Sequence, residues 1–134
     1  MKVLVDTPVW SLALRKNTKP DDTTVAELKE LIREMRVVMT GPIRQEILSG
    51  ISDQDRYTQL MDKLRIYDDL PLKTEYFEDA AQLSNTCRKK GIQGSHTDFL
   101  LCSIAIKNGF SIFTLDNDFI SYSKHLNIIL HKPR

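Results

Sequence analysis

The amino-acid sequence predicts an α/β fold, a three-layer sandwich in which helices cover both faces of a mostly parallel sheet of about five strands. Three observations support this fold class. Short apolar or β-branched runs alternate with longer segments whose apolar residues recur at helical spacing. The chain has 134 residues, enough for one domain with one core. No internal repeat, low-complexity tract or linker interrupts it, so we expect residues 1–134 to form a single domain.

The first predicted strand covers residues 2–5 and ends at Asp6-Thr7-Pro8, where a proline suits the first turn of a helix. The next helix begins at Thr24, because Thr24 and Glu27 have the spacing of a capping box and apolar residues follow at helical intervals. The other elements predicted for this half are a strand over 36–40, a helix over 43–51, a helix over 54–64 and a short strand over 65–70 before Pro71.

The second half continues the alternation of helices and strands. A helix is predicted from Phe77 to Lys90, where cations occupy the last turn and Gly91 ends it. The segment from Thr97 to Lys107 is apolar nearly all round, so this helix should be central and well buried. The elements that complete the chain are a strand over 110–115, a short helix over 116–124 and a strand over 127–131.

Composition and charge exclude several classes of protein. Hydrophobic residues at 41% and charged residues at 28% are typical of globular domains and argue against disorder, collagen-like repeats and coiled coils. The formal charge of +1 gives no sign of a nucleic-acid partner, so any RNA contact must come from local patches. We expect no membrane span and no signal peptide. Cys87 and Cys102 lack disulfide, metal or redox spacing, so we expect a reducing, cytoplasmic location.

Four carboxylates stand out by position. Asp6 follows the first strand, Glu46 lies in the helix over 43–51, Asp98 opens the buried helix and Asp116 follows the strand over 110–115. Ligands of parallel sheets bind beyond the carboxyl ends of the strands, so Asp6 and Asp116 are placed to share one crevice. Each acid alone also has a structural interpretation: Asp6 and Asp116 as helix caps, and Asp98 as the acid of a capping box that begins at Ser95.

Asp98 fits that structural interpretation poorly. Asp98 lies on the core-facing stripe of its helix, because apolar residues follow it at i+3, i+4 and i+7, namely Leu101, Cys102 and Ala105. Glu46 has a similar place beside apolar neighbours. A buried acid is expected to be paired, protonated or bound to a cation. Clustered carboxylates raise one another's pKa, and a divalent cation relieves the repulsion. Ligands that are all oxygens favour Mg²⁺ or Mn²⁺ over zinc.

Four short segments occur in order across nearly the entire chain: VLVDTPVW, GPIRQEIL, HTDFLLCSIAI and FTLDNDF. With them the sequence resembles the PIN-domain family and, within it, the VapC-type toxin ribonucleases. The resemblance implies a PIN-like nuclease domain. By that resemblance the acidic quartet consists of Asp6, Glu46, Asp98 and Asp116, with Asp118 as an accessory acid and metal ligand and Thr114 as a supporting hydroxyl. Pro8 departs from the pattern, since many members carry a small polar residue there.

The resemblance also implies an activity and partners. The expected reaction is Mg²⁺- or Mn²⁺-dependent hydrolysis of RNA phosphodiester bonds, leaving a 5′-phosphate and a 3′-hydroxyl. Asp6, Asp98 and Asp116 would hold the ion directly or through water, and Glu46 would bind a second ion or position the attacking water. The protein is expected to be a homodimer and to bind a cognate antitoxin. Apolar residues around Trp10 are the one local hint of a dimer surface, although burial of Trp10 in the core fits equally well.

Other functions remain as alternatives. A non-catalytic PIN-like binding or scaffold module would be signalled by loss of acids, and all four are present. A phosphatase or phosphotransfer domain would use Asp6 as nucleophile, but the haloacid-dehalogenase type needs a second Asp where Pro8 stands. A receiver domain would need an acidic pair near the first strand. The cations and histidine considered for RNA contact, each with ordinary surface exposure as the alternative, are Arg15, Lys16, Arg88, Lys89, Lys90 and His96.

Overall fold

The computed structural model describes residues 1–15, 19 and 22–134, and Lys16 therefore lies outside the described residues. Helices and strands alternate along the chain as the sequence predicts. Their order is β1 (Val3–Val5), α1 (Thr7–Ala13), α2 (Thr23–Arg33), β2 (Val37–Val38), α3 (Gly41–Ser49), α4 (Gln54–Leu64), α5 (Thr74–Lys89), α6 (His96–Asn108), β3 (Ser111–Phe113), α7 (Asp118–Ser123) and β4 (Ile129–Leu130).

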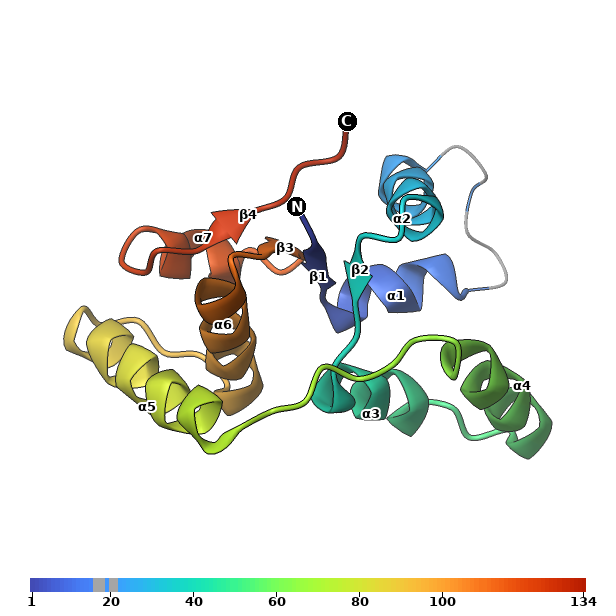
Figure 1. The fold of residues 1–134 in the computed structure, drawn as a ribbon, viewed down its shortest axis with the longest axis horizontal. Coiled ribbons are helices and arrows are strands. Elements are labelled where there is room, and N and C mark those ends of the chain that lie inside the picture. Colours follow the sequence, from blue (N-terminus) through green and yellow to red (C-terminus); the bar gives the residue numbers. More distant parts are fainter. Residues whose placement is uncertain (16–18, 20–21) are drawn as a thin grey trace.

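The strands form one parallel sheet in the order β2-β1-β3-β4. Val3 on the central strand β1 pairs with Val37 on one side and Ser111 on the other. Figure 1 shows the sheet in the middle of the molecule, with α1 and α2 on one side and α5 and α6 on the other. The predicted α/β class with a parallel sheet between helices is confirmed. Because all strands are parallel, their carboxyl ends lie at one edge of the sheet.

The predicted short strand over 65–70, the third along the chain, is reduced to a single bridge between Met39 and Asp69. The amide of Leu70 donates to the carbonyl of Met39 at 2.9 Å, and the pairing ends there. Pro71 follows directly and has no N–H with which to continue a ladder. Arg44 of α3 holds the segment from the other side, since its guanidinium donates to the carbonyls of Leu64 and Tyr67.

The core surrounds β1 and α6. All three residues of β1 are fully buried, and every residue of α6 from Phe99 to Ala105 is buried as well, which confirms the prediction of a central helix. Trp10 is also in the core, with 3% of its surface exposed and its ring edge-on to Tyr67. Of the two interpretations of Trp10, burial in the core is confirmed and the exposed patch is wrong. Within the described residues, no helix is long and apolar enough to cross a membrane.

The start of α2 differs from the predicted capping box. Its N-cap is Asp22, whose Oδ1 accepts from the amides of Thr24 at 2.9 Å and Val25 at 3.1 Å. Glu27 does not return to the helix start. Its side chain is buried, and its Oε1 accepts from Nε of Arg134 at 2.9 Å. The short side chain of Asp22 thus caps the helix and leaves Glu27 available for a tertiary contact.

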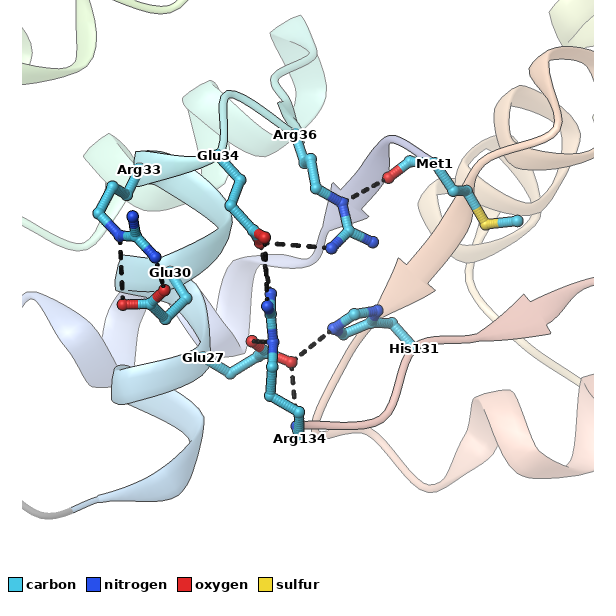
Figure 2. A network of polar contacts seen from close by, with 8 residues as sticks. All are labelled: Met1, Glu27, Glu30, Arg33, Glu34, Arg36, His131 and Arg134. Atoms are coloured by element: carbon cyan, nitrogen blue, oxygen red, sulfur yellow. Dashed lines mark hydrogen bonds and ion pairs between the residues drawn. The ribbon is translucent and has the colours of Figure 1, made fainter.

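That contact is part of a polar network between α2 and the segment that follows β4 (Figure 2). Oε2 of Glu27 lies 3.0 Å from Nε2 of His131 and accepts from the amide of Arg134 at 3.1 Å. The Arg134 guanidinium also pairs with Glu34, and Glu34 pairs with Arg36 at 3.3 Å. Burial alone would raise the pKa of Glu27, but the hydrogen bonds from His131 and Arg134 outweigh it and lower that pKa. We call these five residues the Glu27 network.

Candidate active site

The carboxyl edge of the sheet carries a chain of hydrogen bonds that joins β1 to β3. Asp6 follows β1 and caps α1, because its Oδ1 accepts from the amide of Thr7 at 2.8 Å. Its other oxygen, Oδ2, accepts from Oγ1 of Thr114 at 2.8 Å. Oγ1 of Thr114 in turn accepts from the amide of Asp116 at 3.0 Å. The structure thus brings Asp6, Thr114 and Asp116 together at the edge where the sequence predicts a crevice.

Two further carboxylates, those of Asp98 and Asp118, meet Asp116 at this edge. Asp98, Asp116 and Asp118 each offer an oxygen that lies within 4.8 Å of the oxygens offered by the other two, and we call this group the acidic centre. Asp118 opens α7 and its amide donates to Oδ1 of Asp116 at 2.9 Å. Asp98 and Asp116 are half-buried, whereas Asp118 is exposed. Asp6 is not part of the group of three, but it is joined to Asp116 through Thr114.

The backbone of Asp98 is fixed by the cap of α6. Ser95 is the N-cap, and its Oγ accepts from the amide of Asp98 at 3.0 Å, as the sequence predicts. The Asp98 carboxylate takes a different partner, since its Oδ2 accepts from the hydroxyl of Tyr122 at 2.7 Å. Burial and the neighbouring Asp98 raise the pKa of Tyr122 far above its usual value, so this hydroxyl is a donor at any ordinary pH.

Among the described residues, no basic side chain neutralises the acids at this edge. Burial raises the pKa of Asp6, the negative charges of Asp98 and Glu46 add to the effect, and the hydrogen bonds from Thr114 and Thr7 oppose it. The pKa of Asp98 is raised mainly by burial and further by Asp116 and Asp118, against the hydrogen bonds with the side chains of Tyr122 and Ser95. In the part of the chain that the structure describes, no lysine, arginine or histidine forms an ion pair with Asp6, Asp98, Asp116 or Asp118. The edge therefore carries concentrated negative charge.

Glu46 has a different position from the one expected. It lies on α3 but its side chain is exposed, because Ile43 and Ile47 occupy the face that packs into the core. The expected core-side placement of Glu46 is wrong. Glu46 is nevertheless close enough for its charge to raise the pKa of Asp6. It stands outside the acidic centre, on the solvent side of the same edge.

Two residues of this edge, Tyr122 and Thr40, are not among the site residues that the sequence predicts. Tyr122 was grouped with a short helix and not with the site. Thr40 follows β2 in the same row as Asp6 and Thr114, since the register pairs Val3 with Val37 and Val5 with Phe113. It is fully buried, and its Oγ1 has no hydrogen-bond partner among the described residues. The sequence gives a partial signal for Thr40, because it is the polar residue that ends the predicted strand over 36–40.

A groove of about 390 Å³ lies between α5 and α6 beside these acids. His96 and Thr97, which directly precede Asp98, form part of its wall. The walls are largely apolar, and Phe77 on α5 is 52% exposed there. The residues that line the groove are Pro42, Phe77, Ala80, Ala81, Ser84, Asn85, Arg88, His96, Thr97, Phe99 and Leu100.

Comparisons with known proteins agree with this geometry. The family model of the PIN domain matches residues 3–125. The VapC ribonuclease Mb1587 of Mycobacterium bovis and Ribonuclease VapC11 of Mycobacterium tuberculosis are each 30% identical to the chain over 133 residues, which covers 94% of the chain and 95% of the relative.

Two solved structures share the fold. FitAcB from Neisseria gonorrhoeae has a TM-score of 0.79 at 21% identity, covering 98% of this chain and 97% of the other. VapBC2 from Rickettsia felis, bound to a DNA fragment from its promoter, has a TM-score of 0.77 at 17% identity and covers 98% of both chains. The chain has a parallel sheet with acids at one edge, and the PIN domain model matches it over residues 3–125. It belongs to the PIN domain family, in its VapC group.

Proposed function

We propose that residues 1–134 form a single nuclease domain that hydrolyses RNA phosphodiester bonds with a divalent metal ion, and that the protein is the toxin of a toxin-antitoxin pair. The acidic centre carries this proposal: three carboxylates from α6, α7 and the end of β3 gather at the carboxyl edge of the sheet without a basic partner among the described residues. The ribonuclease names of the VapC relatives support it.

The donor set fits Mg²⁺ or Mn²⁺. Asp98, Asp116 and Asp118 would hold the ion through oxygens alone, which hard cations prefer and zinc does not. Burial and mutual repulsion raise the pKa values of Asp6 and Asp98, and a bound cation would offset this repulsion. When bound, such an ion lowers the pKa of a water molecule and offsets charge on the phosphate that is attacked.

The side chains of this chain divide the remaining tasks. Thr114 and the amide of Thr7 hold both oxygens of Asp6, which fixes that carboxylate beside the acidic centre. Asp6 would contact the ion directly or through water. Glu46 is exposed on the same edge, so its carboxylate is free to orient the attacking water or to bind a second ion. Hydrolysis in this arrangement would leave a 5′-phosphate and a 3′-hydroxyl.

A metal-dependence experiment tests the proposed activity. Purified protein is incubated with total RNA in Mg²⁺, Mn²⁺ or Zn²⁺, with and without EDTA. Cleavage in Mg²⁺ and Mn²⁺ that EDTA abolishes is expected, and Asp116→Asn should remove it. Asp62→Asn on α4 is the matched control, since it makes the same exchange at an exposed position outside the site. Cleavage that persists in EDTA would refute the metal mechanism, and no cleavage of any RNA would favour a non-catalytic binding or scaffold module.

The partners are proposed on separate grounds. FitAcB and VapBC2 are named as two-component assemblies, and we infer that this chain also binds a cognate antitoxin, whose tail would cross the acidic edge. A cytoplasmic location would give the enzyme access to RNA. The homodimer needs a surface other than Trp10, which is buried, and the groove with the exposed Phe77 offers one. Light scattering at micromolar concentration should show a dimer that Phe77→Asp dissociates, and a monomeric wild type would refute it.

A further inference from the structure

Tyr122 connects an aromatic core to the acidic centre. Its side chain is fully buried, and its ring centroid lies 5.0 Å from that of Phe99 and 5.2 Å from that of Phe119. A hydroxyl buried among aromatic rings needs a hydrogen-bond partner. Here that partner is the carboxylate of Asp98, which accepts at 2.7 Å through Oδ2. The hydroxyl therefore lies between the core and an acid that the proposed function places on the metal ion.

We propose that Tyr122 is a positioning residue for the acidic centre: its hydroxyl fixes the Asp98 carboxylate beside Asp116 and Asp118, and Gly94 leaves the space that this hydroxyl occupies. The catalytic consequence of this proposal rests on the proposed function. Its consequence for metal binding does not depend on which substrate the protein cleaves.

The type of donor matters for this role. Repulsion from Asp116 and Asp118 acts on the Asp98 carboxylate, and the hydrogen bond from the Tyr122 hydroxyl opposes it, together with the Ser95 side chain. A lysine or arginine would hold the carboxylate but would also cancel the charge that a cation needs. A tyrosine hydroxyl makes a strong hydrogen bond to the carboxylate and leaves its negative charge and its second oxygen available.

Gly94 is the second part of the arrangement. A Cβ atom built on Gly94 would collide with the hydroxyl oxygen of Tyr122 and would lie 2.7 Å from its Cζ and 3.0 Å from Cε2 of Phe99. Phe99 and Phe119 pack against the same ring, so Tyr122 cannot move away without disturbing the core. The loop before α6 must therefore carry a residue without a side chain where it passes the hydroxyl.

The test compares two exchanges of tyrosine for phenylalanine. Tyr122→Phe keeps the ring and removes the hydroxyl from Asp98. Tyr76→Phe is the matched control, because the Tyr76 hydroxyl accepts from Asn108 at 3.0 Å on the α5–α6 surface and touches no acid of the site. The Kd for Mn²⁺ of the metal-free protein is measured by electron paramagnetic resonance, with metal-free Tm, kcat and KM for RNA alongside.

We expect Tyr122→Phe to raise the Kd for Mn²⁺ by about 10–100-fold, the usual cost of removing a partner of a metal ligand. The kcat should fall with it while KM for RNA stays unchanged, because the buried hydroxyl cannot touch the substrate. Tyr76→Phe should change none of these. Gly94→Ala should raise the Kd by a larger factor in wild type than in Tyr122→Phe, since the clash with the hydroxyl is lost in the second background and only the close contacts with the rings remain.

The outcomes separate the two proposals. If Tyr122→Phe binds Mn²⁺ as wild type does, or lowers only the metal-free Tm, the hydroxyl serves packing alone and the positioning role is wrong. If wild type binds Mn²⁺ but cuts no RNA, the proposed function fails, while the Kd of Tyr122→Phe still decides the positioning role. If wild type binds no Mn²⁺, both proposals are wrong.

Discussion

The hydroxyl of Thr114 donates to Oδ2 of Asp6 at 2.8 Å across 108 positions of sequence, and it is the side-chain contact that links the ends of β1 and β3 at the acidic edge. Because Oγ1 of Thr114 also accepts from the backbone amide of Asp116, one threonine holds the Asp6 carboxylate and the backbone of Asp116. A hydrogen bond to a charged group contributes more to stability than one between neutral groups. Thr114 therefore serves both the fold and the geometry of the site.

Replacing Thr114 by valine should expose both roles. Thr114→Val keeps the β-branched shape but leaves Oδ2 of the buried Asp6 carboxylate without its donor, and we expect a loss of about 1.5–3 kcal/mol in the free energy of unfolding. Loss of the donor should also raise the pKa of Asp6 further and weaken Mn²⁺ binding at mildly acidic pH. Urea denaturation and Mn²⁺ titration measure the two effects. Thr86→Val on α5 is the control, since Thr86 only donates to a backbone carbonyl of its own helix.

The raised pKa values of Asp6 and Asp98 predict how pH affects the metal-free protein. In the folded state the pKa of each acid lies above its ordinary value of 3.8. Protonation of the two acids therefore stabilises the folded protein at low pH, and this stabilisation is lost as the pH rises through the raised pKa. Asp98→Asn removes one of these charges. Its advantage in Tm over wild type should be small near pH 3.8 and should grow toward neutral pH.

The metal should cancel this pH effect. A divalent cation binds the charged carboxylates, so saturating Mn²⁺ should raise the Tm of wild type at neutral pH and reverse its order with Asp98→Asn. Scanning calorimetry over a pH series, with and without Mn²⁺, measures both curves. Parallel Tm curves for wild type and Asp98→Asn without metal would mean that the acidic centre stores no repulsion.

The sequence predicted the fold because its strongest signals come from buried elements. The strand at 2–5 and the helix at 97–107 are apolar enough to be assigned by pattern, and both are in the core. The prediction of a strand over 65–70 was wrong because Pro71 stops the ladder after one bridge. Strand pairing depends on the partner strand as well as on the propensity of the segment. The predicted N-cap of α2 was wrong because Asp22 and Thr24 both suit that position, and the spacing of the apolar residues does not distinguish them.

Only those site residues that follow the ends of strands could be placed from the sequence. Asp6 and Asp116 meet because β1 and β3 are parallel neighbours, and Asp98 joins them from the start of α6. By contrast, the partners of Glu27 are His131 and Arg134, which lie 104 and 107 positions away. The partner of the Asp98 carboxylate is Tyr122, a residue of another helix. Such contacts are set by tertiary packing. No spacing rule within one helix reveals them.

Glu27→Gln should destabilise the protein through the Glu27 network. Glu27 is 3% exposed and accepts from His131 and Arg134, so loss of its charge should cost about 1.5–3 kcal/mol. Because its pKa is lowered in the folded state, this stability is present above the ordinary value of 4.5 and is lost as the pH falls through the lowered pKa. The difference in Tm from wild type should therefore shrink at acidic pH.

A neighbouring position provides the control for that variant. Glu30 lies on the same helix and pairs with Arg33 at the surface, where the exposed pair contributes little. Glu30→Gln should leave the Tm unchanged at every pH. If Glu27→Gln and Glu30→Gln have the same small effect, the Glu27 network does not hold the end of the chain against α2.

Asp98→Asn gives the sharpest separation between a structural and a metal-binding role. Ser95 already caps the amide of Asp98, so the carboxylate is not needed to start α6. Asparagine keeps an oxygen that accepts the Tyr122 hydroxyl but removes the charge that a cation requires. If Asp98 is a ligand, cleavage and Mn²⁺ affinity should fall by more than about 100-fold, beyond the usual cost of losing an outer partner.

Metal-free stability should move the other way in this variant. Relief of repulsion from Asp116 and Asp118 should keep the Tm of Asp98→Asn equal to or above that of wild type at neutral pH. Asp62→Asn, which makes the same exchange on the exposed side of α4, should change neither activity nor affinity. An Asp98→Asn protein that cuts RNA at the wild-type rate would show that Asp98 is not a ligand. Because Asp98 is the member of the acidic centre that α6 contributes, that result would also remove the geometric basis of the metal proposal.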